Sequence, residues 1–398
     1  MRGLRRFLIF LVGVSIPFNN VAFSFAGRNW SLGLIASAVY ILTMLPDINK
    51  ISRIVSYGKY IFNLLWFAIL LTLLNFIHAN YYGTPIIPTT MFMCSVLFYI
   101  MLLHNLLDIG VARRCMYGMA LGSVMMAICL LCGIGVEFDD DSRLQMFGEN
   151  SNSLGVYTCV GAIILFNDFI IRDRLNIKKF RFVLLLAYIP IVILLFATGS
   201  RVAFISFVLS FVVGVAFFKP RATRRKLIVV LLSMCIAFVL YLISQKADFV
   251  IFERLLSTAQ EGNISGREHI LKTLWPYAIK HLLWGVGQTG YVQISQEALG
   301  GVLVTVGTIY GISPHNVLVE ILLYTGIWGL ILYVSFWYKT IGCAKWIFKE
   351  SMNIQPIVLF IPILGCVLSG QILYAKWAFV IYAYILAEKR TLMENHGL

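Results

Sequence analysis

Charged residues are scarce in this 398-residue sequence, because Asp, Glu, Lys and Arg together make up only 13% of it. Soluble domains carry about 25% charged residues, so the deficit excludes a cytosolic enzyme and a disordered protein. Hydrophobic residues instead reach 60%, and the mean hydropathy is +0.86. A bilayer core about 30 Å thick needs roughly 20 apolar residues per helix, so the length allows about twelve spans. The composition therefore predicts an all-α polytopic membrane protein.

The spacings that mark disulfide, metal and redox sites are also lacking. Most of the eight cysteines fall within apolar runs, where they are typical of small buried hydrophobes, and this excludes a secreted disulfide scaffold. Cys129 and Cys132 form a CxxC without a second pair, which argues against a zinc or redox site. We interpret the acidic run at 139–141 as a solvated loop, because no further carboxylate or histidine spacing accompanies it. No cofactor and no metal are expected.

Two glycine patterns have structural rather than chemical interpretations. The G-x-G-x-x-G at residues 285–290 follows an expected helix rather than a strand, so it does not indicate a dinucleotide site. Gly118 and Gly122 form a small-xxx-small pattern within an apolar run. That pattern predicts close packing against a neighbouring helix.

Continuous apolar runs mark the expected membrane spans, with loose boundaries. They cover residues 4–18, 30–46, 60–76, 90–107, 115–136, 153–171, 180–198, 201–218, 227–244, 316–338, 354–370 and 373–387. The chain thus divides into helices one to nine (1–244), a mixed-polarity loop (245–315), and the last three helices with a tail (316–398).

Acidic residues are outnumbered, with 18 against 32 basic ones, and the basic excess is unevenly placed. If the N-terminus is cytoplasmic, most Lys and Arg residues fall in the cytoplasmic segments. Excess Lys and Arg in short cytoplasmic loops is the usual topological signal. The net charge of +14 therefore orients the chain in its membrane with both termini cytoplasmic, and it requires no nucleic-acid partner.

The loop 245–315 would lie on the opposite, non-cytoplasmic side. Within it, Ser265 to Glu268 fits a capping box that begins a helix, in which apolar residues recur at helical spacing up to Leu283. Pro276 should kink this helix. We expect it to lie along the membrane surface and to roof a cavity that faces the lipid.

Four polar clusters are expected on the same non-cytoplasmic side. They contain Arg143 with Asn152, Ser200 with Arg201, Gly266 with Arg267, and His315 with Asn316 and Glu320. Each arginine alone could be an anchor at the membrane edge. Together, on one face and partly at helix N-termini, they favour a site that binds a lipid-linked diphosphate.

His315 is the candidate base in this set. It directly precedes an expected membrane helix, and its ordinary pKa of ~6.5 suits abstraction of a proton from a hydroxyl. Glu320 lies one turn into that helix and could orient or balance the site. A structural hydrogen bond is the alternative role for this histidine.

In these motifs the chain resembles the bacterial O-antigen ligase and O-antigen polymerase family, over residues 143 to 332. The resemblance implies transfer of a glycan from an undecaprenyl-diphosphate carrier to a sugar hydroxyl, without metal. Carried onto matching positions, Arg201 and Arg267 would bind the diphosphate as leaving group, with Arg143 assisting, and His315 would be the general base. Asn152, Ser200, Asn316 and Glu320 would contact the diphosphate or the glycan.

The resemblance leaves the acceptor open between lipid A–core, for a ligase, and a second lipid-linked repeat unit, for a polymerase. Some polymerases carry an R-x10-G pattern, whereas Arg143 reaches Gly155 with eleven residues between, and Arg267 has Ala278 at the matching place. This departure favours the ligase. A flippase for the same lipid is a further alternative, but it would be expected to place more charges within the spans.

Overall fold

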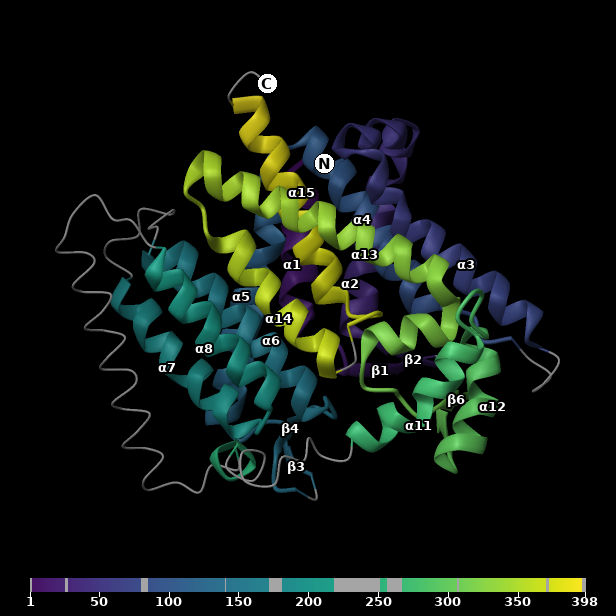
Figure 1. Ribbon diagram of the computed structural model, residues 1–398. Helices are drawn as coiled ribbons and strands as arrows, with labels where there is room; N and C mark the ends of the chain where they lie inside the picture. Colours follow the sequence, from purple (N-terminus) through teal and green to yellow (C-terminus); the bar gives the residue numbers. More distant parts are fainter. Residues whose placement is uncertain are drawn as a thin grey trace.

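The structure, a computed structural model, describes residues 2–25, 28–79, 85–139, 141–171, 181–217, 251–255, 267–305, 308–369 and 372–395. These residues form a mostly helical protein (Figure 1). The α-helices are α1 (Arg2–Ser15), α2 (Leu32–Met44), α3 (Asn63–Ile77), α4 (Thr89–Leu107), α5 (Val111–Leu131), α6 (Ser151–Ile164), α7 (Arg181–Ala197), α8 (Arg201–Ala216), α11 (Arg267–Lys280), α12 (Gly287–Leu299), α13 (Val317–Ser351), α14 (Gln355–Ser369) and α15 (Lys376–Asn395). Two 3₁₀ segments, η1 (Leu45–Tyr57) and η2 (Lys59–Phe62), join α2 to α3, and a π-helical segment, η4 (Leu165–Ile171), extends α6.

The expected spans coincide with these helices, apart from residues 227–244, which lie outside the described part of the chain. Five described helical stretches are long and apolar enough to cross a membrane, and three further apolar helices are shorter. The five stretches are Leu32–Tyr57, Lys59–Ile77, Thr89–Leu107, Val111–Leu131 and Val317–Ser351. Helices suit lipid because they satisfy their own backbone hydrogen bonds. The helical membrane fold is thus supported, while the number of twelve spans stays a prediction.

Three short hairpins depart from the all-α prediction. They pair β1 (Ala22–Phe25) with β2 (Arg28–Ser31), β3 (Val136–Phe138) with β4 (Leu144–Met146), and β5 (Val302–Thr305) with β6 (Thr308–Gly311), all antiparallel. Strands of three or four residues are too short for the alternation of apolar and polar residues that would reveal them in a sequence. The last hairpin falls in the loop 245–315, which also holds α11 and α12.

Glycines bring α1 and α5 into backbone contact. A Cβ atom added at Gly118 would lie 2.1 Å from the carbonyl oxygen of Phe10, and one added at Gly13 would lie 2.1 Å from that of Cys115. Gly122 approaches Val14 in the same way. The predicted role of Gly118 and Gly122 in helix packing is confirmed, because any side chain here would force the two helices apart.

Helix α13 is broken at Gly326, whose φ of 63° and ψ of −159° are not helical. The chain between α11 and α12 enters the break and satisfies the interrupted backbone. The N–H of Ile327 donates to the carbonyl of Leu282 at 2.7 Å, and the N–H of Val286 donates to that of Leu323 at 2.7 Å. The loop helices are thereby attached to the membrane helix that follows them.

The predicted loop helix is confirmed as α11, and it continues across Pro276. Its buried residues include Leu274 and Ala278, whereas Trp275 and Ile279 are half exposed. Ser265, the predicted N-cap of this helix, and the neighbouring Gly266 lie outside the described residues. An apolar outer surface on this helix is compatible with the expected position along the membrane.

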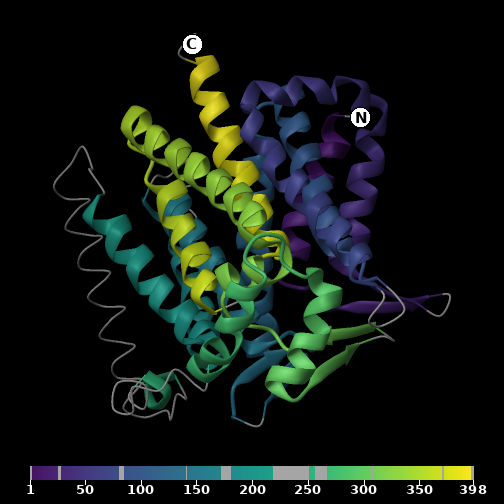
Figure 2. The same ribbon diagram turned by 45° about the vertical axis from the view of Figure 1, so that its right-hand side comes forward.

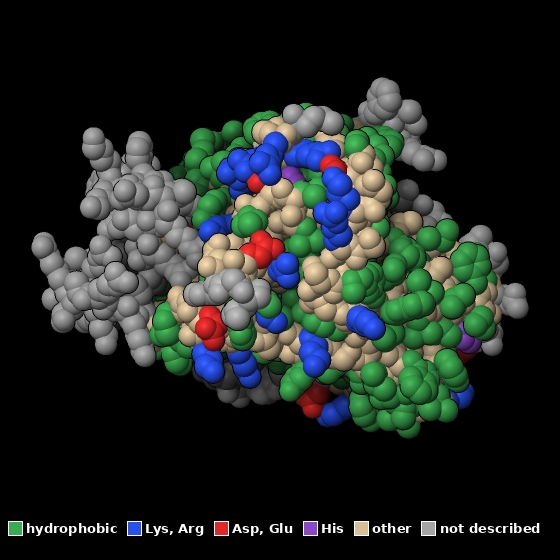
Figure 3. Space-filling model, turned by 90° about the horizontal axis from the view of Figure 1, so that it is seen from above, with side chains coloured by type: hydrophobic (Ala, Val, Ile, Leu, Met, Phe, Trp, Pro, Cys, Tyr) green, Lys and Arg blue, Asp and Glu red, His purple; other side chains and the backbone are tan. Residues whose placement is uncertain are grey.

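The two ends of the molecule differ in character. The start of α1 and the end of α15 lie at one end, while α11 and the hairpins lie at the other (Figures 1 and 2). Seen from the end with the chain termini, Lys and Arg side chains lie in several groups over the middle of the surface, beside a large hydrophobic area (Figure 3). Several are paired there, including Arg5 with Asp47 and Arg6 with Asp108.

Candidate functional site

The turn between α7 and α8 places the first site residues. Gly199 has a φ of 60°, which allows the chain to reverse within three residues. Ser200 then caps α8, because its hydroxyl accepts from the N–H of Ala203. Gly155 of α6 leaves room for this turn, since a Cβ atom there would lie 2.8 Å from that of Ser200. The beginnings of α6 and α8, with Asn152 and Arg201, are thus held side by side.

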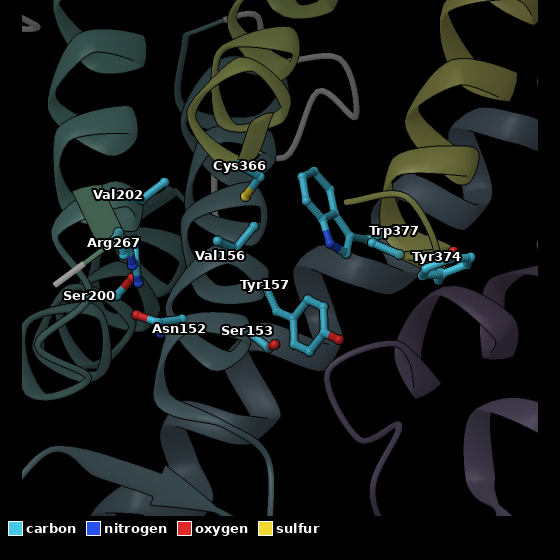
Figure 4. Close-up of a pocket in the computed structure, with 11 residues that line it drawn as sticks. Asn152, Ser153, Val156, Tyr157, Ser200, Val202, Arg267, Cys366, Tyr374 and Trp377 are labelled. Carbon is cyan, nitrogen blue, oxygen red and sulfur yellow. The ribbon is translucent and has the colours of Figure 1, made fainter. Parts of the chain in front are cut away.

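A cavity of about 310 Å³ opens beside these helix ends, and we call it the arginine cavity (Figure 4). Its lining residues are Asn152, Ser153, Val156, Tyr157, Ser200, Val202, Arg267, Cys366, Tyr374, Ala375 and Trp377. Arg267, Ser200 and Asn152 form one side of it, and the aromatic rings lie on the other (Figure 4). Cationic and hydroxyl donors facing aromatic rings can hold a phosphate and a sugar together.

Arg267 lines this cavity, and its charge interacts with those of three other arginines. We call Arg143, Arg201, Arg254 and Arg267 the arginine cluster. Arg254 Nη1 donates to the carbonyl of Gly199 at 3.1 Å, and Arg201 Nη1 lies 3.5 Å from the carbonyl of Arg254. Burial lowers the pKa of Arg267, and the positive charges of Arg254 and Arg143 lower it further. Burial likewise lowers the pKa of Arg254, and the charges of Arg143 and Arg201 add to this effect.

No carboxylate among the described residues pairs with Arg267. A half-buried guanidinium next to other cations favours an anion, because a bound anion would replace lost water and offset the repulsion. The cluster is therefore best suited to a doubly charged group such as a diphosphate.

Arg143 differs from the other arginines of the cluster because it is paired with carboxylates. Its guanidinium pairs with Asp139 at 2.7 Å and lies 3.8 Å from Asp141. Burial alone would raise the pKa of Asp139, but hydrogen bonds from Arg143 and from the backbone lower it overall. Asp141 remains exposed, as the solvated-loop interpretation predicts, whereas Asp139 has a structural role. We therefore expect Arg143 to contribute mainly through its charge.

Glu320 lies in a different cavity, of about 440 Å³, which we call the glutamate cavity. Gln288, Tyr310, Ser313, Tyr324 and Tyr374 also line it. Glu320 is buried and forms a hydrogen bond with Tyr324. Amide, hydroxyl and carboxylate groups among aromatic rings are suited to sugar hydroxyls.

His315 lies between these lining residues in the chain, in an unusual conformation. Its φ is 53°, a left-handed value that residues with a side chain rarely adopt, and its N–H donates to the Ser313 hydroxyl at 3.2 Å. The following residue, Asn316, caps α13 by accepting from the N–H groups of Leu318 and Val319. Strain of this kind is more frequent at functional sites than elsewhere.

The predicted site residues are thus only partly brought together. Asn152, Ser200 and Arg267 line one cavity, with Arg201 and Arg143 nearby, but His315 is not among the residues that line it. Glu320 belongs to the second cavity, and Tyr374 lines both. Sequence reasoning missed Arg254 and the aromatic residues Tyr157, Tyr374 and Trp377. A charged Glu253-Arg254 pair after an apolar run was the available signal for the first.

Comparison with known proteins finds a family match that covers several of the predicted site residues. A model of the O-antigen ligase family matches residues 186–334, a stretch that includes Arg201, Arg254, Arg267 and His315. No curated protein matches the chain. This match accords with the membrane helices. It also accords with lipid-linked glycans as the class of substrate and with ligase-like or polymerase-like glycosyl transfer. Residues 186–334 of this protein are therefore similar to the O-antigen ligase family.

Proposed function

We propose that this protein is an O-antigen ligase-like glycosyltransferase, which moves a glycan from undecaprenyl diphosphate to a sugar hydroxyl of lipid A–core. The observation that carries the proposal is the arginine cluster beside a cavity with an aromatic wall. The reaction would take place at the periplasmic face of the bacterial inner membrane and would need no metal ion.

In the proposed step, the acceptor oxygen attacks the anomeric carbon of the donor and forms the new glycosidic bond. The bond from that carbon to the diphosphate breaks, and the diphosphate leaves with the electron pair. Direct attack inverts the anomeric centre. Arg201, Arg254 and Arg267 stabilise the leaving group, because negative charge grows there in the transition state. Asn152 and Ser200, which also line the arginine cavity, would donate hydrogen bonds to the same group.

His315 accepts the proton of the acceptor hydroxyl in this proposal. Its neighbours Ser313 and Glu320 line the glutamate cavity, so an acceptor sugar bound there would lie near it. The left-handed φ of His315 is consistent with a backbone held in place for function. Asn316 and Glu320 would orient the acceptor sugar.

The test is transfer by the purified full chain in nanodiscs, with a lipid-linked repeat unit as donor and with or without lipid A–core. Glycan that appears only on lipid A–core supports the ligase. Longer lipid-linked chains from the donor alone would show a polymerase. Donor binding without transfer in either reaction would favour the flippase.

The site assignment is tested with four variants in the same assay. Removal of an electrostatic stabiliser typically lowers the rate about 10²- to 10³-fold, and we expect this for Arg267→Ala. His315→Ala and His315→Gly should both be inactive, although glycine tolerates the φ of 53° and should fold at least as stably. Arg390→Ala, which breaks only a pair with Glu394, serves as the matched control. Near-normal transfer by His315→Gly would show that the base lies elsewhere.

A further inference from the structure

A third cavity adjoins the arginine cavity on the side away from Arg267, and we call it the lysine cavity. It measures about 360 Å³ and shares Tyr157, Tyr374 and Ala375 with the arginine cavity. Figure 4 shows Tyr157 and Tyr374 on the side of the arginine cavity opposite Arg267. Two substrates bound in these cavities would therefore be neighbours.

The lysine cavity is lined mostly by parts of the chain outside the O-antigen ligase match. Its lining residues are Ile16, Asn19, Ser31, Leu34, Thr89, Thr90, Met93, Cys94, Tyr157, Tyr374, Ala375 and Lys376. They come from the ends of α1, α2, α4, α6 and α15. A ligand bound in the lysine cavity would thus contact the N-terminal helices. These helices contribute no residue to the arginine cluster.

Lys376 supplies the charge of this cavity. Its ammonium group lies 3.3 Å from Asn19 Oδ1, and no carboxylate among the described residues pairs with it. Gly33 lies behind this pair, since a Cβ atom there would be 2.9 Å from Lys376 Nζ and 2.7 Å from Asn19 Oδ1. The absence of a side chain at Gly33 leaves the space that the lysine head occupies.

The remaining walls combine two kinds of surface. Ser31, Thr89 and Thr90 provide hydroxyl groups, whereas Ile16, Leu34 and Met93 are apolar. Met93 is also largely exposed on the outer surface of α4, where lipid would surround it. A cation with hydroxyls on one side and an apolar wall on the other matches a phosphate ester attached to a lipid.

We propose that the lysine cavity binds a phosphate group of the acceptor lipid, held by Lys376, while the arginine cavity holds the donor diphosphate. This inference rests on the proposed function. The phosphate could belong to a polyprenyl carrier, as in a polymerase, or to a phosphorylated lipid A–core, as in a ligase. In both cases the N-terminal helices hold the phosphate of the acceptor, beside the glutamate cavity, which shares Thr89, Thr90 and Tyr374 with the lysine cavity.

The first experiment counts binding sites on the full chain in zwitterionic nanodiscs, with geranylgeranyl diphosphate as the probe. We expect two molecules per protein for the wild type and for Lys345→Gln, which removes an exposed lysine. Lys376→Gln and Arg267→Gln should each bind one molecule, and the double variant none. Two sites in Lys376→Gln, or one in the wild type, would overturn the proposal.

A second variant separates loss of the site from loss of the fold. Gly33→Ala keeps the lysine but displaces its flexible head, so it should weaken the second site about tenfold and leave the first unchanged. Lys376→Arg should restore the second site because it keeps the charge. If Gly33→Ala binds both molecules with wild-type affinity, the lysine head does not hold the phosphate.

Competition then distinguishes the source of the phosphate. Displacement of the second probe molecule by lipid A, but not by dephosphorylated lipid A, would assign the cavity to a phosphorylated glycolipid. Displacement by polyprenyl phosphate alone would assign it to a carrier lipid. Displacement by phosphatidylglycerol with equal affinity would overturn the proposal in favour of a site for bulk lipid.

The transfer assay keeps this inference distinct from the proposed function. Lys376→Gln should raise the KM for the acceptor about tenfold and leave the KM for the donor unchanged. If Lys376→Gln leaves the KM for the acceptor unchanged while Arg267→Ala loses transfer, only the proposed phosphate site of the lysine cavity is wrong. If Arg267→Ala also transfers normally, the assignment of the donor diphosphate to the arginine cavity is wrong as well, whereas the proposed function itself is contradicted only if the wild type transfers no glycan.

Discussion

Among single residues, Arg254 and Arg267 of the cluster carry an electrostatic cost. Arg254 and Arg267 are both partly buried and lie within reach of other positive charges, which disfavours the charged form of each. Such an arrangement lowers the stability of the empty protein and is offset only when an anion binds. The same cost explains why these residues are better understood as a binding device than as anchors at the membrane edge.

Glu149, just before α6, is the residue whose protonation should control stability near neutral pH. Burial raises its pKa to about 7, although a hydrogen bond with Ser153 of the arginine cavity acts in the opposite direction. The folded protein therefore holds this proton more tightly than the unfolded chain, whose pKa is near 4.5. This group's contribution to stability should fall by about 3 kcal/mol as the pH rises from 4.5 to 7, and then stay level.

The prediction is checked by thermal unfolding in detergent. Glu149→Gln removes the titration, so its melting temperature should exceed that of the wild type by more at pH 8 than at pH 5. Glu297→Gln, at an exposed position of α12, is the control. An equal difference at both pH values would mean that Glu149 is not protonated in the fold.

Among the elements, the broken helix α13 organises the site. Its short first part carries Glu320, its longer second part packs in the bundle, and the chain between α11 and α12 fills the break. A Cβ atom added at Gly285, in the G-x-G-x-x-G pattern, would lie 2.5 Å from the backbone nitrogen of Thr325, and one added at Gly287 would lie 2.6 Å from Asn75 Oδ1 of α3. These glycines therefore serve close backbone packing, in agreement with the exclusion of a dinucleotide site.

Gly326 should be intolerant of substitution for this reason. In Gly326→Ala, the new Cβ atom would lie 2.5 Å from the carbonyl oxygen of Leu283, at a φ of 63°. We expect the free energy of unfolding to fall by at least about 2 kcal/mol. Gly342→Ala, in the same helix with no atom within 4 Å of the added Cβ, should be neutral or stabilising by up to about 1 kcal/mol. Thermal unfolding of both variants provides the measurement, and equal effects would contradict the role given to the break.

For the whole molecule, the separation of the two ends bears on its orientation in the membrane. Basic residues gather at the end with the chain termini (Figure 3), whereas α11, whose first residue Arg267 lines the arginine cavity, lies at the other end (Figure 1). Basic loops favour the cytoplasmic side, so the cavities would face the periplasm. This orientation suits donors that are presented on the outer leaflet.

Cysteine labelling tests the orientation directly. In a background with Cys129, Cys132 and Cys235 replaced by serine, Lys272→Cys on α11 should react with a membrane-impermeant maleimide in spheroplasts. Arg2→Cys, at the exposed start of α1, should react only in inverted vesicles. The reverse pattern would place the cavities on the cytoplasmic side and remove the ligase from consideration.

The sequence predicts the positions of the helices better than it predicts how the site is assembled. The helices could be located closely because each apolar run must be helical in lipid, and Gly118 and Gly122 also indicated where two of them meet. The break at Gly326 could not be foreseen, because an isolated glycine in an apolar helix is usually tolerated. The hairpins were missed because their strands are too short to show a period.

The sequence by itself determined that this protein is a helical membrane protein and which arginines face one side of it, because hydropathy and charge act locally along the chain. Only the tertiary structure decided which of those residues meet. It brought Asn152, Ser200 and Arg267 around one cavity, added Arg254, and put Glu320 and Lys376 in two others that meet at Tyr374. The physical reason is that helix packing sets these distances, through contacts between segments far apart in the chain.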